Sequence, residues 1–204
     1  EKALARWAGA SWFLDEALAA PARAGDLPKA WRLGPDPNLV QMHYQALARV
    51  QPDAVELTMR EFISKERSLT AGADQTGVRV HRMPQRPKDV DDDGDFHFAV
   101  LGPSAASDPG KPSADARRFL DETTGPDRPR VHRNAVLLAV PSKDGLELLS
   151  GRVRDYLAWQ EVGKLPEATG FDEQREALLK AHMEEARRKV PEAVVQAYNI
   201  VVTV

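Results

Sequence analysis

Apolar residues recur at helical spacing through the first part of the chain. The spacing predicts three helices, over residues 3–20, 38–50 and 53–69. A stretch rich in proline and glycine, expected to be a loop or short hairpin, separates the first from the second. Asp36 or Asn38 is expected to cap the second helix and Asp53 the third, with a turn at 68–77. The pattern therefore predicts a helical subdomain over residues 1–75.

The pattern changes after this segment, where short apolar runs alternate with helical spacing. Strands are predicted over residues 78–83, 96–102, 130–141 and 199–204. Helices are predicted over residues 114–124, from 144 onward and over 171–198. Ser113 should cap the first of these, and Pro191 should kink or restart the last. Residues 135–140 are apolar throughout, as in a strand that is covered on both faces. This alternation predicts an α/β domain over residues 76–204 with a largely parallel sheet flanked by helices.

Composition narrows the possible functions. The 204 residues are 42% hydrophobic and 29% charged, with a net charge of −3 and no cysteine. Disulfides and cysteine-based metal sites are thus excluded, and no overall charge attracts the chain to nucleic acid. No apolar run approaches the roughly 18 residues of a membrane helix, so we expect no membrane partner and a cytoplasmic location. Because the chain starts at Glu1 and ends on an apolar run, we expect a fragment of a longer protein.

The segment after the strand at 96–102 has the outline of a phosphate-binding loop. A Walker A loop needs four residues between its glycines and a hydroxyl after the lysine. Here seven residues separate Gly102 from Gly110, and Pro112 follows Lys111. The spacing favours a strand-to-helix connection capped by Ser113, while a degenerate nucleotide site at Gly110 and Lys111 remains the alternative. A Walker B strand and a G-x-S-x-G motif are also absent, so no catalytic residue is predicted.

An acidic loop precedes the same strand. Asp89, Asp91, Asp93 and Gly94 match positions 1, 3, 5 and 6 of a calcium-binding loop. The bidentate glutamate expected at position 12 is missing, and a strand follows instead of a helix. The candidate metal ligands are therefore Asp89, Asp91, Asp93 and Asp95, and the alternative is a solvated acidic turn between two strands.

A basic cluster lies at the start of the most apolar strand. It contains Arg128, Arg130, His132, Arg133 and Asn134. On a strand, Arg130, His132 and Asn134 would share one face, where the cluster could hold a phosphate or a partner's carboxylate. It could also act on a neighbouring ATPase as a trans-acting arginine. The structural alternative is a set of ion pairs with nearby acids, here Asp121 and Glu122.

Three stretches of the chain together resemble a known family. These are residues 31–43, 78–103 and 128–162. Their shared features are Pro-Asn-Leu opening a helix, an acidic loop feeding the strand FHFAVLGP, and Arg-x-x-Arg-Asn before an apolar strand whose following helix carries Leu-Ala-Trp. On these features the chain resembles the large bacterial and archaeal proteins of domain-of-unknown-function family 499.

The resemblance implies an origin in a predicted AAA-plus-type ATPase that is associated with phage defence and found beside DNA methyltransferases. ATP and magnesium would belong to the parent protein, because the Walker motifs lie outside this segment, and no cofactor is expected in the segment itself. Only Arg130, Arg133 and Asn134 carry over from the family pattern. The first hypothesis is a non-catalytic region that couples nucleotide state to DNA, to a methyltransferase-system protein or to the rest of the parent chain. The alternative is a DNA- or protein-binding module with winged-helix-like N-terminal helices.

Overall fold

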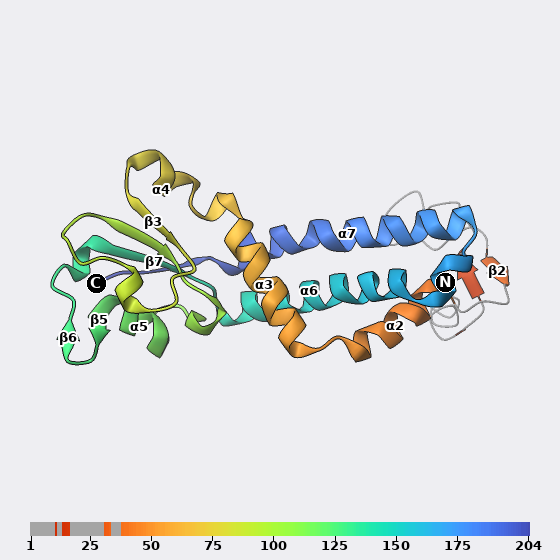
Figure 1. Ribbon diagram of the computed structural model, residues 1–204, viewed down its shortest axis with the longest axis horizontal. Coiled ribbons are helices and arrows are strands. Elements are labelled where there is room, and N and C mark those ends of the chain that lie inside the picture. The colour runs from red at the N-terminus through yellow and green to blue at the C-terminus, as the bar shows by residue number, and fades with distance from the viewer. Residues whose placement is uncertain (1–10, 12–13, 17–30, 34–37) are drawn as a thin grey trace. The chain divides into compact units, whose positions relative to one another are not determined.

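The chain is described by a computed structural model that places Ser11, residues 14–16, 31–33 and 38–204. The described residues form two compact units that alternate along the sequence (Figure 1). One unit contains the described residues up to Pro52 together with 154–187, and the other contains 53–153 with 188–204. Residues 53–75 therefore belong to the same compact unit as the sheet. The division of the protein into domains at residue 75 stays a prediction.

A four-stranded sheet is the centre of the second unit, which we call the sheet unit (Figure 1). In spatial order its strands are β3 (Arg79–Arg82), β4 (His97–Val100), β7 (Val136–Val140) and β8 (Ile200–Val202). The first three are parallel to one another, and β8 is antiparallel to β7. The α/β class with N-terminal helices and a largely parallel sheet is therefore confirmed. Buried side chains lie on both faces of β7, with Leu138 and Val140 on one and Ala139 on the other, as expected for an apolar run covered on both faces.

One face of this sheet carries the core of the unit. Alternate positions of a strand share a face, so Ala99 and Leu101 point the same way, as do Leu138 and Val140. Helix α5 (Ala114–Asp121) adds buried side chains to the same cluster, namely Ala116, Phe119 and Leu120. Burying each large side chain of this kind contributes about 1.5–3 kcal/mol. The cluster therefore fixes α5 against β4 and β7.

Local signals set the ends of α5. Ser113 is its N-cap, as predicted, and its Oγ accepts a hydrogen bond from the Ala116 amide at 3.2 Å. The helix ends at Asp121 instead of the predicted residue 124, because β5 (Glu122–Gly125) pairs antiparallel with β6 (Arg128–Pro129).

Helices precede the sheet in the same unit. They are α3 (Pro52–Lys65), the 3-10 turn η1 (Arg67–Leu69) and α4 (Ala71–Thr76). Because proline suits the first helical position, α3 starts at Pro52, and Asp53, the predicted cap, lies in its first turn. The turn predicted at 68–77 is wrong, since α4 occupies it. The Thr70 hydroxyl bonds Asp74 at 2.8 Å, and Gly77 ends the helix in the left-handed conformation.

Two long helices pass through both units. They are α6 (Lys143–Lys164) and α7 (Glu173–Ala197), joined by η5 (Pro166–Gly170), and each contributes residues to both units. Pro191 lies inside α7, which continues through it without the predicted restart, while the predicted alternative, a kink, stays a prediction. Proline removes one backbone hydrogen bond from this turn of the helix. Val190 and Val194 in the same region are fully buried, so their packing stabilises the helix there.

The helical unit combines α2 (Leu39–Arg49) with parts of α6 and α7. Asn38 caps α2, accepting from the Gln41 amide at 2.7 Å, which confirms one of the two predicted caps. At the centre Trp159 is stacked between two imidazole rings, with centroid distances of 4.2 Å to His43 and 4.4 Å to His182. His43 Nε2 also lies 3.0 Å from an oxygen of Asp155. This stack joins α2, α6 and α7.

The N-terminal stretch differs from its prediction where it is described. Residues Leu14–Glu16 form strand β1, which pairs antiparallel with β2 (Trp31–Leu33). The helix predicted over 3–20 is therefore wrong at these positions, because the pairing with residues 31–33 fixes their backbone and local spacing cannot show that partner. Ser11, also within the predicted helix, has no helical assignment, and the rest of that helix and Asp36 lie outside the described residues.

Candidate functional site

Arg130, the centre of the predicted basic cluster, is buried inside the sheet unit. Its side chain is only 3% exposed. Its guanidinium donates to the carbonyl oxygens of Val90 and Asp91, at 3.1 and 2.8 Å from Nη1, and of Pro87, at 3.1 Å from Nη2. A further, longer bond of 3.4 Å reaches the Glu122 carbonyl. Arg130 therefore closes the backbone turn over residues 87–91, and its guanidinium does not face solvent.

The other members of the cluster do not form the predicted strand face. The strand β6 ends at Pro129, and residues 133–135 form the 3-10 turn η4 (Arg133–Ala135). The carboxylate of Asp92 accepts the backbone N–H groups of residues 131 and 132, at 2.7 and 2.9 Å, which strand pairing would otherwise use. Arg128 and Asn134 are exposed, and Arg133 makes an ion pair of 3.1 Å with Asp121. Arg133 therefore makes an ion pair with a nearby acid, which was the alternative to a phosphate or partner contact.

Gly110 and Lys111 belong to a tight turn. Gly110 has a positive φ of 71°. The Lys111 amide donates to the Asp108 carbonyl at 2.9 Å, and the Ser113 amide donates to the Ser107 hydroxyl at 2.9 Å. A phosphate loop needs such amides directed at its ligand. Here they bond within the fold, which supports a strand-to-helix connection.

The acidic loop is held by protein cations and backbone amides. Arg79 pairs with Asp93 at 2.5 Å and with Asp95 at 2.7 Å, and its distance to Asp91 is 3.7 Å. Asp89 is the last residue of the 3-10 turn η2 (Pro87–Asp89), and its carboxylate caps the start of that turn by accepting two backbone amides. Within residues 38–204, as elsewhere in the described chain, no three histidine, aspartate or glutamate side chains are grouped to hold a metal ion. Three of the four candidate metal ligands, Asp91, Asp93 and Asp95, thus lie beside the Arg79 guanidinium.

The pKa of Asp93 makes the folding stability of the sheet unit depend on pH in the acid range. A hydrogen bond from His97 lowers the pKa of Asp93 from 3.8 to about 2. Because the folded-state pKa is depressed, the stabilisation is complete above pH 3.8 and is lost as the pH falls toward 2. We expect Asp93→Asn to be less stable than the wild type at pH 6 and to lose less of its melting temperature on acidification. Circular dichroism melts across this range test this, with Asp127→Asn as the exposed control; parallel acid curves for all three proteins would contradict it.

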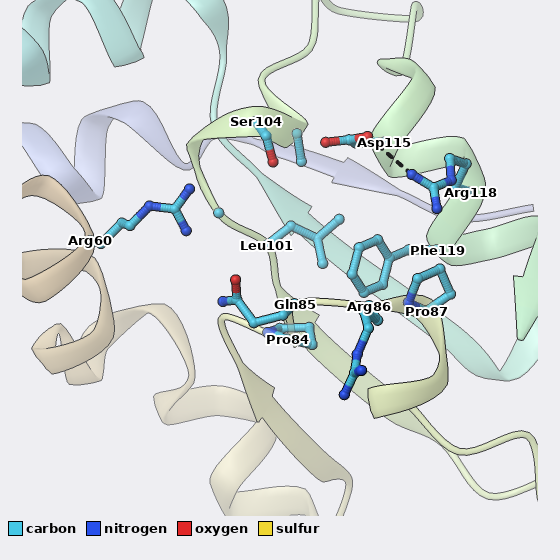
Figure 2. A pocket seen from close by; sticks show the side chains of 12 residues that line it. Arg60, Pro84, Gln85, Arg86, Pro87, Leu101, Ser104, Asp115, Arg118 and Phe119 are labelled. Atoms are coloured by element: carbon cyan, nitrogen blue, oxygen red, sulfur yellow. Dashed lines mark ion pairs between the residues drawn. The ribbon is translucent and has the colours of Figure 1, made fainter. Parts of the chain in front are cut away.

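A pocket lies at the carboxyl ends of β3 and β4 (Figure 2). It has a volume of about 100 Å³ and is formed by the chain following each strand, by α3 and by α5. Its lining residues are Arg60, Pro84, Gln85, Arg86, Pro87, Leu101, Gly102, Ser104, Ala105, Asp115, Arg118 and Phe119. Open parallel sheets bind their ligands outside the carboxyl ends of the strands. We call this feature the arginine pocket, since its lining carries three arginines against a single carboxylate.

Each arginine is oriented by a carboxylate near it in the sequence. Arg60 donates from Nε and Nη2 to Glu56 at 3.0 and 2.8 Å, and Arg118 lies 3.7 Å from an oxygen of Glu122 and 3.8 Å from an oxygen of Asp115. Figure 2 shows these two arginines on opposite sides of Leu101 and Phe119. The Arg86 guanidinium points away from them, and its exposed side chain forms the outer wall. A guanidinium has five N–H donors, so one or two carboxylate contacts leave capacity for a ligand.

The rim of the pocket is fixed by its backbone. The Tyr198 hydroxyl donates to the Leu101 carbonyl at 2.6 Å, and burial raises the pKa of this tyrosine, opposed by the charge of Arg60. Met83, directly after β3, has a φ of 56°, which is uncommon for a residue with a side chain. Its terminal methyl group would lie 3.4 Å from a Cβ placed on Gly102. These contacts fix the backbone positions of the segments after β3 and after β4, which form two sides of the pocket.

None of these arginines was predicted as a site residue. Arg60, Arg86 and Arg118 come from segments far apart in the sequence, and none of them belongs to a motif. The usable signal was the rule that ligands bind at the carboxyl ends of parallel strands. Applied to the predicted strands, it points to the residues after 83 and 102, although it gives no reason to select Arg60.

Comparisons with known proteins give no family for this chain. No family model, no curated protein and no solved structure matches it. Among the residues that the structure describes, no helix combines the length and apolar character needed to span a membrane. The functional argument therefore rests on the geometry of the arginine pocket.

Proposed function

We propose that the sheet unit is a non-catalytic region that binds a backbone phosphate of DNA at the arginine pocket. The observation that carries this proposal is that Arg60 and Arg118 lie on opposite sides of a pocket at the carboxyl ends of parallel strands. Guanidinium groups match phosphate oxygens through paired, charge-assisted hydrogen bonds. In this role Arg60 and Arg118 hold the phosphate from two sides, and Arg86 contacts the chain outside the pocket.

The size of the pocket favours a single phosphate over a whole nucleotide. Pockets for small organic ligands usually measure about 300–1,000 Å³. The arginine pocket, at about 100 Å³, has room for one phosphate group and none for a base and ribose as well. The inward bonds of the Gly110–Lys111 turn also argue against the nucleotide-binding alternative. A polymer that presents one phosphate and continues over the surface fits these dimensions.

This role agrees with the resemblance to a predicted ATPase family. A region that holds DNA while nucleotide hydrolysis occurs elsewhere in the parent chain needs no Walker motif and no catalytic residue of its own. Regions of this kind would pass the nucleotide state of the parent protein to DNA or to a partner. We therefore propose a DNA-coupling region of a defence-associated ATPase.

The test is binding of a fluorescently labelled DNA duplex, measured by anisotropy between about 50 and 200 mM salt. We expect saturable, salt-dependent binding that weakens roughly tenfold or more in the double variant Arg60→Gln/Arg118→Gln, because each charge-assisted bond contributes about 1.5–3 kcal/mol. The matched control, Arg128→Gln/Arg133→Gln, removes the same charge from exposed positions outside the pocket. Equal loss in both double variants, or no binding by the wild type, would refute the proposal. Saturable Mg-ATP binding lost in Lys111→Ala would favour a nucleotide site instead.

A further inference from the structure

Strand β8 forms one edge of the four-stranded sheet. It pairs antiparallel with β7, and across the described ranges of the chain it has no second strand beside it. An edge strand presents a row of backbone N–H and C=O groups that lack a partner in the sheet. The hydrogen bonds of the neighbouring strands show which groups of β8 these are.

The pairing of β7 with β4 fixes the orientation of β8. The Ala139 carbonyl accepts a hydrogen bond from the Leu101 amide at 3.0 Å, so the backbone groups of Ala139 face β4. Backbone groups alternate in direction along a strand, so those of the residues on either side of Ala139 face β8, opposite Val202 and Ile200. The N–H and C=O of Val201, which lies between these two, therefore point away from β7.

The side chains of β8 lie on two different faces of the sheet. Val202 is buried in the core cluster and Ile200 packs against it, whereas Val201 is 61% exposed on the opposite face. The residues that follow the strand, Thr203 and Val204, are exposed as well. The edge thus combines unpaired backbone groups with β-branched side chains, which suit strand pairing.

Charge distinguishes β8 from the other edge of the sheet. Residues 193–204 contain no charged side chain. The opposite edge, β3, carries Arg79 and Arg82, which form ion pairs with aspartates of the same unit. In a two-fold antiparallel pairing a strand meets its own sequence, and like charges directly opposite one another are destabilising. Of the two edges, β8 is therefore the one suited to pair with a second copy of itself.

We propose that β8 is a dimerisation edge, at which two copies of this chain pair antiparallel about a two-fold axis at Val201. In this arrangement the amide of each Val201 donates to the carbonyl of the other, and the Thr203 amide donates to the Asn199 carbonyl of the second copy. Ile200 lies opposite Val202 of the second copy, so the apolar core face continues across the axis. The two four-stranded sheets become one sheet. This inference goes beyond the proposed function and does not depend on the arginine pocket.

The mass of the full chain in solution is the first test. Because the pairing buries little surface, we expect a dissociation constant between about 1 μM and 1 mM. Sedimentation equilibrium across this range should show the average mass rising from one copy toward two. A mass of one copy at every concentration would overturn the proposal and leave the edge to a different partner. A mass that rises beyond two copies would also overturn it, because a two-fold contact closes on itself.

Val201→Lys is the variant designed to prevent the pairing. It keeps the backbone groups of β8 and its bonds to β7, but places two like charges opposite each other at the axis. We expect the dissociation constant to rise by about tenfold or more. Val195→Lys makes the same change at an exposed position of α7 and should retain the wild-type constant. Equal weakening by both variants would show that net charge is the cause and would overturn the proposal.

Hydrogen exchange locates the contact without any variant. The amides of Val201 and Thr203 should become protected as the concentration rises, because they donate across the axis. A dimer in which these amides exchange as fast as in the single chain would have its contact elsewhere and would overturn the proposal. Val201→Pro provides a further check, since edge strands accept proline where the missing N–H faces away from the sheet. We expect this variant to keep the circular dichroism spectrum of the wild type and to lose the dimer.

Discussion

Replacing Arg130 by methionine is expected to lower the free energy of unfolding by about 3–5 kcal/mol. The substitution keeps an apolar stem of similar length but removes the guanidinium donors to the carbonyls of Pro87, Val90 and Asp91, of which Pro87 keeps the Val90 amide. A buried carbonyl left without a donor costs about 1–3 kcal/mol. Urea unfolding followed by circular dichroism measures the loss.

The matched control for this prediction is Arg133→Met. Arg133 belongs to the same cluster, but its side chain is half-exposed and its pair with Asp121 lies at the surface. Such pairs contribute about 0–1 kcal/mol, so we expect little change. A similar, small effect of both substitutions would show that water replaces the Arg130 guanidinium in the turn. It would also make Arg130 available again as a ligand contact.

A second large effect is expected for Gly145→Ala at the start of α6. A Cβ at this position would lie 2.6 Å from the Cα of Ala197 and 2.7 Å from the Ser142 hydroxyl oxygen. Alanine normally stabilises a helix relative to glycine by about 0.5–1 kcal/mol. Here the backbone of α7 must move to admit the methyl group, at a cost of about 1–3 kcal/mol or more. We therefore expect net destabilisation, measured as a lower melting temperature and a lower urea midpoint.

Gly151 provides the matched control within the same helix. A Cβ on Gly151 meets nothing within 4 Å among the described atoms, so Gly151→Ala should raise stability by up to about 1 kcal/mol. Opposite signs for the two substitutions are the expected result. If both variants were more stable than the wild type, α6 and the end of α7 would not approach as closely as described.

Local signals in the sequence predicted much of the sheet unit. Ser113 caps α5 because its hydroxyl oxygen accepts a hydrogen bond from the Ala116 amide, only three residues later. Such a local bond does not depend on distant parts of the chain. The apolar run at 136–140 likewise gave β7. The predictions failed where partners distant in sequence decided the outcome. Residues 14–16 pair with 31–33, and Asp92 takes the amides of residues 131 and 132.

The candidate site was harder to predict than the fold. Arg130 stood out in the sequence because it lies in a basic cluster, yet burial commits its guanidinium to the backbone. Arg60 shows the reverse case, since it looks like an ordinary residue of an amphipathic helix and reaches the site only when α3 packs in the sheet unit. Residue type indicates what an arginine can bind. Its position in the tertiary structure decides whether a ligand can reach it.

The pairing of β8 with β7 constrains the order in which a ribosome can complete this sheet. Translation releases β3, β4 and β7 first, and the whole of α6 and α7 must follow before β8 emerges. At roughly 5–20 residues per second, the uncharged edge of β7 stays unpaired for several seconds in each nascent chain. An open, apolar strand edge is a template for pairing with other chains. The nascent protein is therefore most prone to aggregation after residue 140 and before residue 200 has been made.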